Sequence, residues 1–144
     1  MTDDFFCDKI LLTITNKTEI RVNAMPNETE KIADYDGRYN QLLNISLPQL
    51  EIVQSHGLKT HIEKRHAACV KYIDKIPEII ASPDYVGVNP KEEKSFELVK
   101  VYDDNVLLGI KLDVKNGRYY VATLHEISQS KLDRRVFSGR LKKL

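Results

Sequence analysis

The hydrophobic residues in the first third of the chain form short runs typical of strands. Residues 5–15 are rich in apolar and β-branched side chains, and residues 20–23 continue the pattern after a polar interruption. This predicts a β-hairpin with its turn at residues 16–18. Residues 25–39 are mostly polar and predict a loop. Residues 45–53 have a strand-like pattern interrupted by a proline, which favours an edge strand or an irregular segment.

Two segments in the middle of the chain have helical spacing. Ser55 is a good N-cap for a helix over residues 56–66. A second helix is predicted over residues 68–80, where apolar side chains recur at helical intervals. Pro77 in this segment predicts either a kink or a new helix that starts at Ile76.

The remaining pattern predicts a sheet followed by a helix. A short extended segment at residues 85–88 precedes three strand-like runs with short polar links, which cover residues 96–102, 106–112 and 118–124. Short links predict an antiparallel meander. A helix is expected from Ser128 to Leu141, with Gly139 ending it. The predicted fold class is therefore α+β: an N-terminal β-hairpin region, two helices, an antiparallel β-meander and a C-terminal helix.

Composition fits one domain, with or without a small N-terminal appendage. The chain has 144 residues, of which 42% are hydrophobic and 30% are charged, and its net charge is +1. This charge gives the molecule as a whole no strong attraction for nucleic acid, so a basic surface has to be local. We expect a β-rich extension over residues 1–45 and the main domain over residues 46–144.

A local excess of positive charge exists near the end of the sequence. Residues 131–144 contain one acid, Asp133, and six bases, namely Lys131, Arg134, Arg135, Arg140, Lys142 and Lys143. Such a run is commonly a solvated helix or tail. The alternative is a surface that faces phosphate groups.

The cysteines and the hydropathy pattern indicate the compartment. Cys7 and Cys69 are the only cysteines, and the apolar surroundings of Cys69 favour a buried thiol. The sequence shows no signal-peptide pattern and no apolar stretch of membrane-spanning length. We therefore expect a cytoplasmic protein without a membrane partner.

The densest group of reactive side chains is the run from His61 to His66, which holds two imidazoles and a guanidinium on one predicted helix. Imidazole transfers protons near neutral pH and arginine binds anions. His61 and Arg65 have i,i+4 spacing and can address one ligand. His66 points elsewhere unless the helix ends there and the chain turns.

Structural explanations for these residues are also available. The helix dipole favours a histidine at a helix C-terminus, which would account for His66, and Arg65 can extend from the edge of the core. Zinc is a weaker interpretation, because His61 and His66 lack i,i+4 spacing and the cysteines form no pair motif. We predict no metal and no cofactor.

The predicted strands supply further polar candidates. Strict alternation places Tyr120, Ala122 and Leu124 on one face of the last strand, and Tyr119, Val121 and Thr123 on the other. The preceding strands carry Lys100 and Lys111. Strand threonines, lysines and tyrosines usually serve packing or face water, so a binding role is the less common alternative.

The order of several short segments resembles a known family. The segments are 58–66, 76–80, 83–87, 123–128, and Lys131 with 138–141. They resemble the phage-associated nucleases of the barnase, EndoU, colicin-tRNase and RelE-like superfamily, over roughly the C-terminal 95 residues. The family pattern has a proline after its Arg-His pair, where this chain has Ala67.

This resemblance implies an endoribonuclease, often a toxin domain of a phage or mobile element, whose sheet face is the active surface. His61, Arg65 and His66 match the helix motif, and Thr123, Ser128 and Lys131 match polar positions around the last strand. The predicted catalytic residues are His61, Arg65, His66, Thr123 and Lys131. The predicted substrate-binding residues are Lys100, Lys111, Tyr120, Ser128, Arg135 and Arg140.

The hypothesis that follows is metal-independent RNA cleavage by attack of a ribose 2′-OH on the adjacent phosphorus, which leaves a 2′,3′-cyclic phosphate. His61 would be the base or acid and His66 the alternate proton carrier. Arg65 and Lys131 would hold the phosphate, and Thr123 would donate a hydrogen bond to it.

The expected partner is tRNA or another structured RNA, and the resemblance adds a cognate immunity protein or antitoxin. The alternatives are a binding module for RNA or protein with the same fold and no turnover, and a metal-dependent hydrolase or phosphatase.

Overall fold

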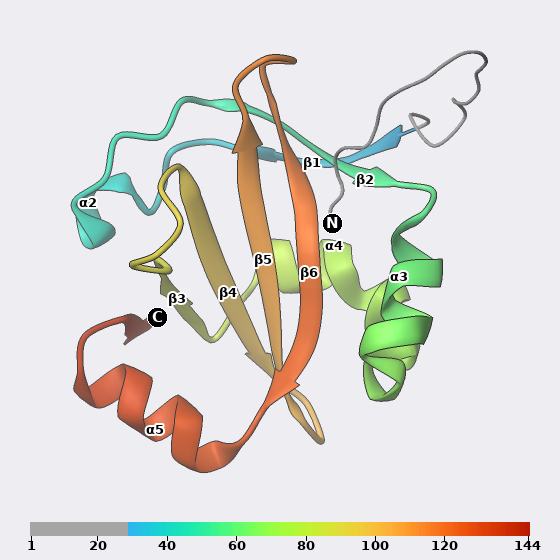
Figure 1. Cartoon of the computed structure of the whole chain (residues 1–144). Helices are drawn as coiled ribbons and strands as arrows, with labels where there is room; N and C mark the ends of the chain where they lie inside the picture. The colour runs from blue at the N-terminus through green and yellow to red at the C-terminus, as the bar shows by residue number, and fades with distance from the viewer. Residues whose placement is uncertain (1–28) are drawn as a thin grey trace.

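The computed structural model describes residues 29–144, and in this part of the chain seven strands form one sheet in the order β1-β2-β6-β5-β4-β3-β7 (Figure 1). The strands are β1 (Thr29–Tyr35), β2 (Leu50–Ser55), β3 (Tyr85–Gly87), β4 (Ser95–Val101), β5 (Asn105–Asp113), β6 (Arg118–Ile127) and β7 (Leu141–Lys143). β2 pairs with β6 in parallel, and all the other pairings are antiparallel.

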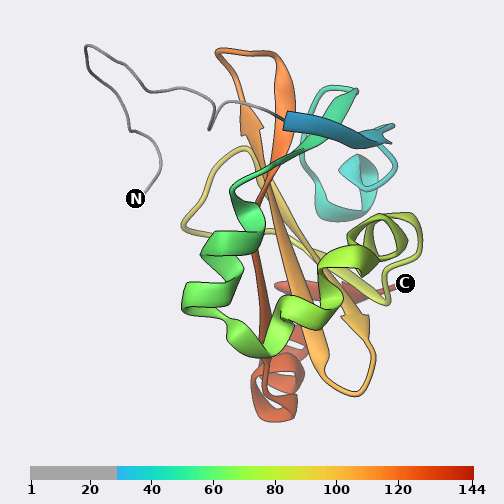
Figure 2. The same ribbon diagram turned by 90° about the vertical axis from the view of Figure 1, so that its right-hand side faces the viewer.

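The helical elements are α2 (Asn40–Leu43), α3 (Leu58–Arg65), the 3₁₀ helix η2 (Ala67–Lys75), α4 (Ile76–Ala81) and α5 (Gln129–Phe137). In Figure 1, α4 lies behind the sheet, α3 lies beside β6, and α5 lies near the end of the strands where β6 finishes. Figure 2 shows α3, η2 and α4 as one continuous group against the sheet.

The β4–β5–β6 meander, the helix α3 and the α+β class are as predicted, but the complete sheet is not a simple meander. The prediction of a loop over residues 25–39 was wrong for β1. The prediction of an edge or irregular segment at residues 45–53 was confirmed for residues 45–49, which form no helix or strand, and was wrong for residues 50–53, because β2 pairs with a strand on each side. The predicted hairpin over residues 5–23 lies outside the described residues, and the division at residue 45 stays a prediction.

Several boundaries were resolved by local chemistry. The second predicted helix is a 3₁₀ helix followed by α4, which starts at Ile76 with a proline in its first turn, one of the two predicted outcomes. Ser55 does not cap α3, because its Oγ accepts from the Gly57 N–H and Gly57 holds the N-cap position. Ser128 caps α5 by accepting from the Lys131 N–H.

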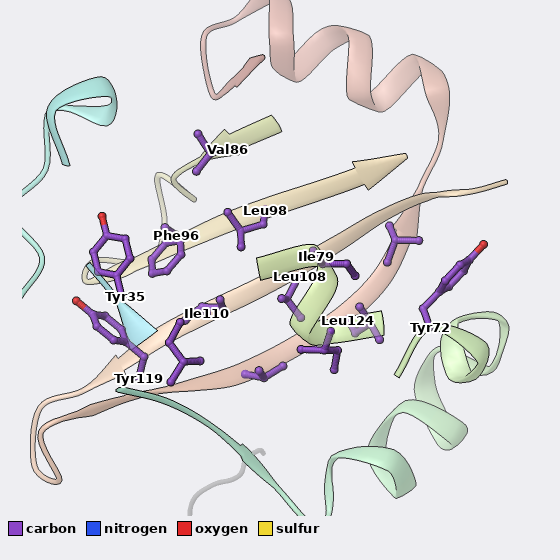
Figure 3. Close-up of a cluster of buried hydrophobic side chains, with 14 of the residues drawn as sticks. Tyr35, Tyr72, Ile79, Val86, Phe96, Leu98, Leu108, Ile110, Tyr119 and Leu124 are labelled. Carbon is purple, nitrogen blue, oxygen red and sulfur yellow. The ribbon is translucent and has the colours of Figure 1, made fainter. Parts of the chain in front are cut away.

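The main core fills the space between the sheet and the α3–η2–α4 group (Figure 3). Tyr35, Phe96 and Tyr119 form an aromatic cluster in it, with ring centroids 4.8 to 5.9 Å apart. Ile62 of α3 and Ile79 of α4 are fully buried against this face. Tyr119 is therefore a core residue and not a surface for stacking bases.

The opposite face of the sheet is covered differently. A small cluster of Val99, Leu107, Ile127, Leu132 and Leu141 packs α5 and β7 against one end of this face. Cross-strand partners share a face of the sheet, so residues 97, 109 and 123 lie on this side, next to the small cluster. Apolar burial thus fixes α5 at one end and leaves polar residues beside it.

The connection from α5 back to the sheet passes very close to β3. A Cβ atom added to Gly87 would lie 1.9 Å from the backbone oxygen of Arg140, and β7 pairs with β3 at this point. Only glycine permits this close approach. Gly87 therefore allows the backbone at Arg140 to lie against β3, from where the Arg140 side chain reaches Glu97.

We expect Gly87→Ala to destabilise the protein by about 3 kcal/mol, because the clash is with backbone and no side chain can move to relieve it. Urea unfolding measures this. Gly57→Ala is the matched control, since its Cβ would meet only Ser55 Oγ at 3.6 Å, and its effect should stay within about 0.5 kcal/mol. Equal stability of the two variants would contradict the steric argument.

Candidate active site

Three histidine rings from two distant segments adjoin one another. The ring centroids of His61 and His66 are 6.2 Å apart, and those of His66 and His125 are 5.3 Å apart. α3 ends at Arg65, and His66 leaves the helical conformation with φ −142° and ψ 55°. The helix therefore ends where the chain turns, and this turn brings His66 towards His125 on β6.

His125 reaches this position through a β-bulge in β6. Val121 pairs with Ile110 but Thr123 pairs with Gly109, so Ala122 is an extra residue opposite β5. The predicted strict alternation was wrong for this reason. Tyr119, Val121 and Leu124 all belong to the main core.

Other side chains of β6 point to the face of the sheet opposite the main core. Tyr120, Thr123 and His125 lie on the side of the sheet where α5 packs, as the pairing of His125 with Leu107 requires. The Thr123 hydroxyl lies 3.3 Å from His125 Nδ1, within hydrogen-bond distance. Thr123 thus contacts a ring that takes part in the histidine cluster.

Burial and positive charge keep these imidazoles neutral. Desolvation lowers the pKa of His125 to about 4, and His66, Arg135, Lys131 and Arg140 contribute in the same direction. Desolvation also lowers the pKa of His66, assisted by Arg65. At neutral pH His125 is therefore a proton acceptor.

A pair of arginines and one carboxylate lie on the same face. The side chain of Glu97 on β4 is buried, and its two oxygens accept hydrogen bonds from Arg140 Nε and Nη2 at 3.2 and 2.9 Å. Arg135 of α5 is half-buried, and desolvation followed by the charge of Arg140 lowers its pKa. Its buried Nη1 makes no hydrogen bond with any residue in the 29–144 range.

A buried N–H donor without an acceptor is uncommon and costly. The charge of Glu97 also acts on Arg135, but Glu97 is hydrogen-bonded to Arg140, and Arg135 forms no ion pair of its own within residues 29–144. This arrangement suits an anion supplied from outside the chain.

Gly109 of β5 lies between Glu97 of β4 and Thr123 of β6, the residue that contacts His125. Glu97, Gly109 and Thr123 occupy one row across β4, β5 and β6. A Cβ on Gly109 would lie 2.7 Å from Thr123 Cγ2, so a larger residue would force the Thr123 side chain to move. The middle residue of this row therefore carries no side chain. Glu97, bound to Arg140, lies on one side of it on β4, and Thr123 lies on the other side on β6.

A comparison with known families relates the chain to phage-associated nucleases. The family model described as phage-Barnase-EndoU-ColicinE5/D-RelE like nuclease 3 matches residues 30–134. The chain belongs to this family. No curated protein and no solved structure matches the chain.

In this nuclease, the structure brings some of the predicted residues together and leaves others apart. His61, His66, Thr123, Arg135 and Arg140 all contribute to the arrangement around His125 and Glu97. Lys131 is exposed in the first turn of α5 and lies close enough to His125 to affect its pKa. Arg65 is exposed at the end of α3, and its charge adds to the desolvation that lowers the pKa of both His61 and His66.

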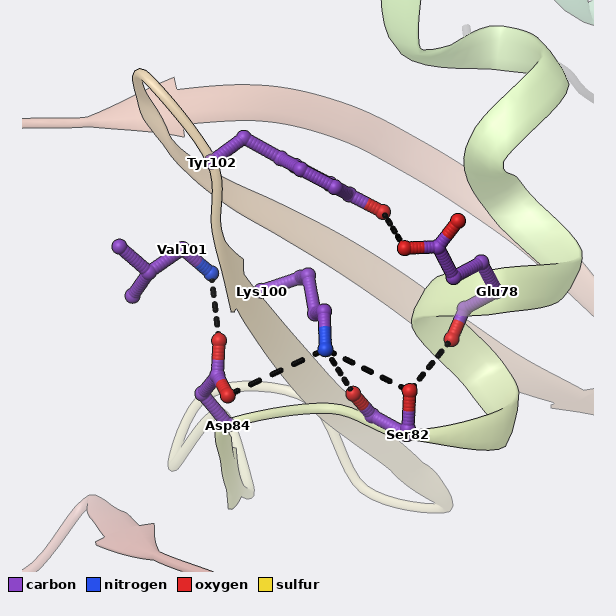
Figure 4. A network of polar contacts seen from close by, with 6 residues as sticks. All are labelled: Glu78, Ser82, Asp84, Lys100, Val101 and Tyr102. Atoms are coloured by element: carbon purple, nitrogen blue, oxygen red, sulfur yellow. Dashed lines mark hydrogen bonds and ion pairs between the residues drawn. The ribbon is translucent and has the colours of Figure 1, made fainter.

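The other predicted binding residues have different surroundings. Lys111 and Tyr120 are cross-strand neighbours on the site face, but Lys111 forms an ion pair with Glu92. The Ser128 hydroxyl is used in capping α5. Lys100 lies on the helix side of the sheet, where it donates to the Ser82 carbonyl at 2.7 Å and lies 4.0 Å from Asp84 (Figure 4). The structure therefore does not bring Lys100 to the site.

Sequence reasoning did not select Glu97 or His125 as site residues. His125 lies in the 123–128 segment that carried the resemblance, and its distance of two residues from Thr123 was a usable signal. Glu97 gave no signal, because its role depends on Arg140, which is 43 positions away in the sequence.

Residues 29–144 hold neither a metal-binding cluster nor a helix able to span a membrane. No group of three or more His, Cys, Asp or Glu side chains in this range is arranged to hold a metal ion. None of its helices has the length and apolar character needed to cross a membrane. Cys69 is buried, as expected, and burial raises the pKa of its thiol to about 11.

The low pKa of His125 predicts a pH dependence of stability. The unfolded chain binds a proton at this residue near pH 6.5, whereas the folded chain does so near pH 4. Stability should therefore fall as the pH drops from 6.5 to 4, by on the order of 2 kcal/mol after allowance for partial exposure. Urea unfolding across this range should show a smaller slope for His125→Asn, and an NMR titration should place the ring midpoint near 4. An unchanged slope in the variant would contradict the assignment.

Proposed function

We propose that this nuclease is a metal-independent endoribonuclease that cleaves RNA by attack of a ribose 2′-OH and leaves a 2′,3′-cyclic phosphate. The observation that carries the proposal is the position of His66 and His125. Their ring centroids are 5.3 Å apart, and His125 lies on the sheet face covered by α5, where Arg135 has a buried N–H without an acceptor among the described residues. Proton carriers and a free guanidinium are the groups that this reaction requires.

The two imidazoles divide the proton transfers in the proposed mechanism. His125, neutral above a pKa of about 4, accepts the proton of the 2′-OH as its oxygen attacks phosphorus. His66 donates a proton to the leaving 5′ oxygen, and the anionic phosphodiester favours the protonated form of His66. The new bond joins the 2′ oxygen to phosphorus, and the bond from phosphorus to the 5′ oxygen breaks. His61, beside His66, is the third proton carrier.

The charge that develops on the phosphoryl oxygens needs positive groups and donors. Arg135 supplies the free guanidinium, and Arg140, held by Glu97, supplies a second one in a fixed orientation. Thr123 is positioned to donate a hydrogen bond, and Lys131 adds charge from the first turn of α5.

The wider setting is also a proposal. The family resemblance suggests a toxin of a phage or mobile element that acts on RNA in the cytoplasm and is inhibited by an immunity protein or antitoxin. Tyr120, 39% exposed on the site face, offers an aromatic ring on which a base can stack.

The test is incubation of the protein with tRNA and rRNA in EDTA, followed by analysis of the new ends. We expect 2′,3′-cyclic phosphates, and a loss of about 10²–10⁴-fold in kcat for His66→Ala and for His125→Ala. Bound but intact RNA would instead identify a binding module. Activity abolished by EDTA would identify a metal-dependent hydrolase.

Neighbouring arginines on α5 provide a matched test of the anion site. Arg135→Gln should lower kcat/KM about 10²–10³-fold, because the phosphate loses its free guanidinium. Arg134→Gln removes the same charge from an exposed position one residue away and should change kcat/KM less than about threefold. Equal losses in the two variants would mean that only net charge matters.

A further inference from the structure

The two branches of the Thr123 side chain contact different neighbours. Its hydroxyl lies 3.3 Å from Nδ1 of His125, which is two residues further along β6 and on the same face of the sheet. Its methyl group lies towards Gly109, the partner of Thr123 on β5, where an added Cβ would be 2.7 Å from Cγ2. The methyl group therefore occupies room that exists because Gly109 has no side chain.

Gly109 also determines where the hydroxyl of Thr123 lies. The methyl and the hydroxyl of a threonine are both bonded to Cβ, so one torsion angle, χ1, places both of them. A side chain at position 109 would push the methyl group away and rotate this torsion angle, which would take the hydroxyl away from the imidazole. The contact between Thr123 and His125 thus depends on a glycine of the neighbouring strand.

The hydrogen bond between Thr123 and His125 can run in two directions, which correspond to different tautomers of the ring. If the hydroxyl donates to Nδ1, the proton of the neutral ring is on Nε2; if the hydroxyl accepts from Nδ1–H, Nε2 has the lone pair. Only the second arrangement allows Nε2 to accept a proton. It also leaves the hydroxyl proton of Thr123 free for a phosphate oxygen.

The positive charge around His125 favours the second arrangement. Lys131, Arg135 and Arg140 all act on this ring. Glu97 holds Arg140 on this face of the sheet through two hydrogen bonds. Cations attract a lone pair and repel an N–H group, so the ring is more stable with its N–H turned to the neutral threonine hydroxyl.

We infer that Gly109 and Thr123 position His125 as the base: Thr123 accepts a hydrogen bond from Nδ1–H, and Nε2 takes the proton of the 2′-OH. Once Nε2 has taken this proton, the ring is an imidazolium with an N–H at each nitrogen, and the Thr123 oxygen still accepts from Nδ1. The identity of the transferred proton rests on the proposed function, whereas the tautomer is a property of the free protein.

NMR of ¹⁵N-labelled histidine rings measures the tautomer in the free protein, because protonated and bare ring nitrogens give distinct signals. At neutral pH His125 is uncharged, since its pKa is about 4, and its signals are identified by their loss in His125→Asn. We expect the proton on Nδ1 in the wild-type chain. Thr123→Val keeps the shape of the side chain but removes the oxygen, so the signals should shift towards the Nε2–H form.

Gly109→Ala tests the role of the glycine without removing a polar atom. It should shift the tautomer in the same direction as Thr123→Val, because the displaced hydroxyl no longer accepts from Nδ1. The double variant Gly109→Ala with Thr123→Ser lacks the methyl group that clashes but keeps the oxygen, so it should recover the Nδ1–H form. Thr123→Ser alone should keep that form. The single and the double variant contain the same alanine, so a general effect of this alanine on the strand would persist in both.

RNA cleavage should follow the same order as the tautomer. Thr123→Val and Gly109→Ala should each lower kcat about 10²–10³-fold, because a base in the wrong tautomer cannot take the proton. The double variant should return to within about tenfold of Thr123→Ser, since both retain the oxygen that accepts from Nδ1.

Three results would overturn the inference. These are a wild-type spectrum with the proton on Nε2, a Gly109→Ala spectrum identical to that of the wild type, and a double variant whose tautomer remains shifted.

The spectra also separate this inference from the proposed function. If the tautomers are as expected but the protein cleaves no RNA, the positioning of His125 by Thr123 and Gly109 stands and the ribonuclease proposal fails. If the protein cleaves RNA and this activity requires His125, but the wild-type proton is on Nε2, the ribonuclease proposal stands and the positioning is overturned.

Discussion

The extra residue at Ala122 is the constraint on which the site depends. β6 has to bury Tyr119, Val121 and Leu124 on the helix side and still present His125 on the other. Strict alternation cannot satisfy both requirements, because residues 121 and 124 are separated by an odd number of positions. The bulge changes the phase of the strand, so that one strand serves the core with one set of side chains and the site with the other.

The two faces of the sheet are held by different forces. The helix face is apolar and closely packed, and its burial fixes the backbone positions from which the other face is built. On that other face, an arginine with a half-buried guanidinium and histidines with lowered pKa values reduce stability rather than increase it. The small apolar cluster beneath α5 offsets this cost and holds Arg135 and Lys131 in place. Functional sites commonly show such a local loss of stability.

The pattern of residues was sufficient to predict the elements that are stabilised by interactions between residues close in the sequence. The meander has strong strand formers and short links, and α3 has helical spacing, so both could be predicted. β1 could not, because its sequence is polar and it is a strand only through pairing with β2. The same limit applies to the site. The histidines, Arg65 and Thr123 are visible in the sequence, whereas Glu97 and Gly109 acquire their roles through cross-strand register, which alternation alone does not specify.

The separation of 43 positions between Glu97 and Arg140 means that the two partners of this ion pair are synthesised at different times. β3 and β4 are synthesised well before β7, so Glu97 is available on the nascent chain while its arginine partner is still inside the ribosomal exit tunnel. A ribosome translating this message therefore carries a growing polypeptide in which the Glu97 carboxylate has not yet met its guanidinium partner.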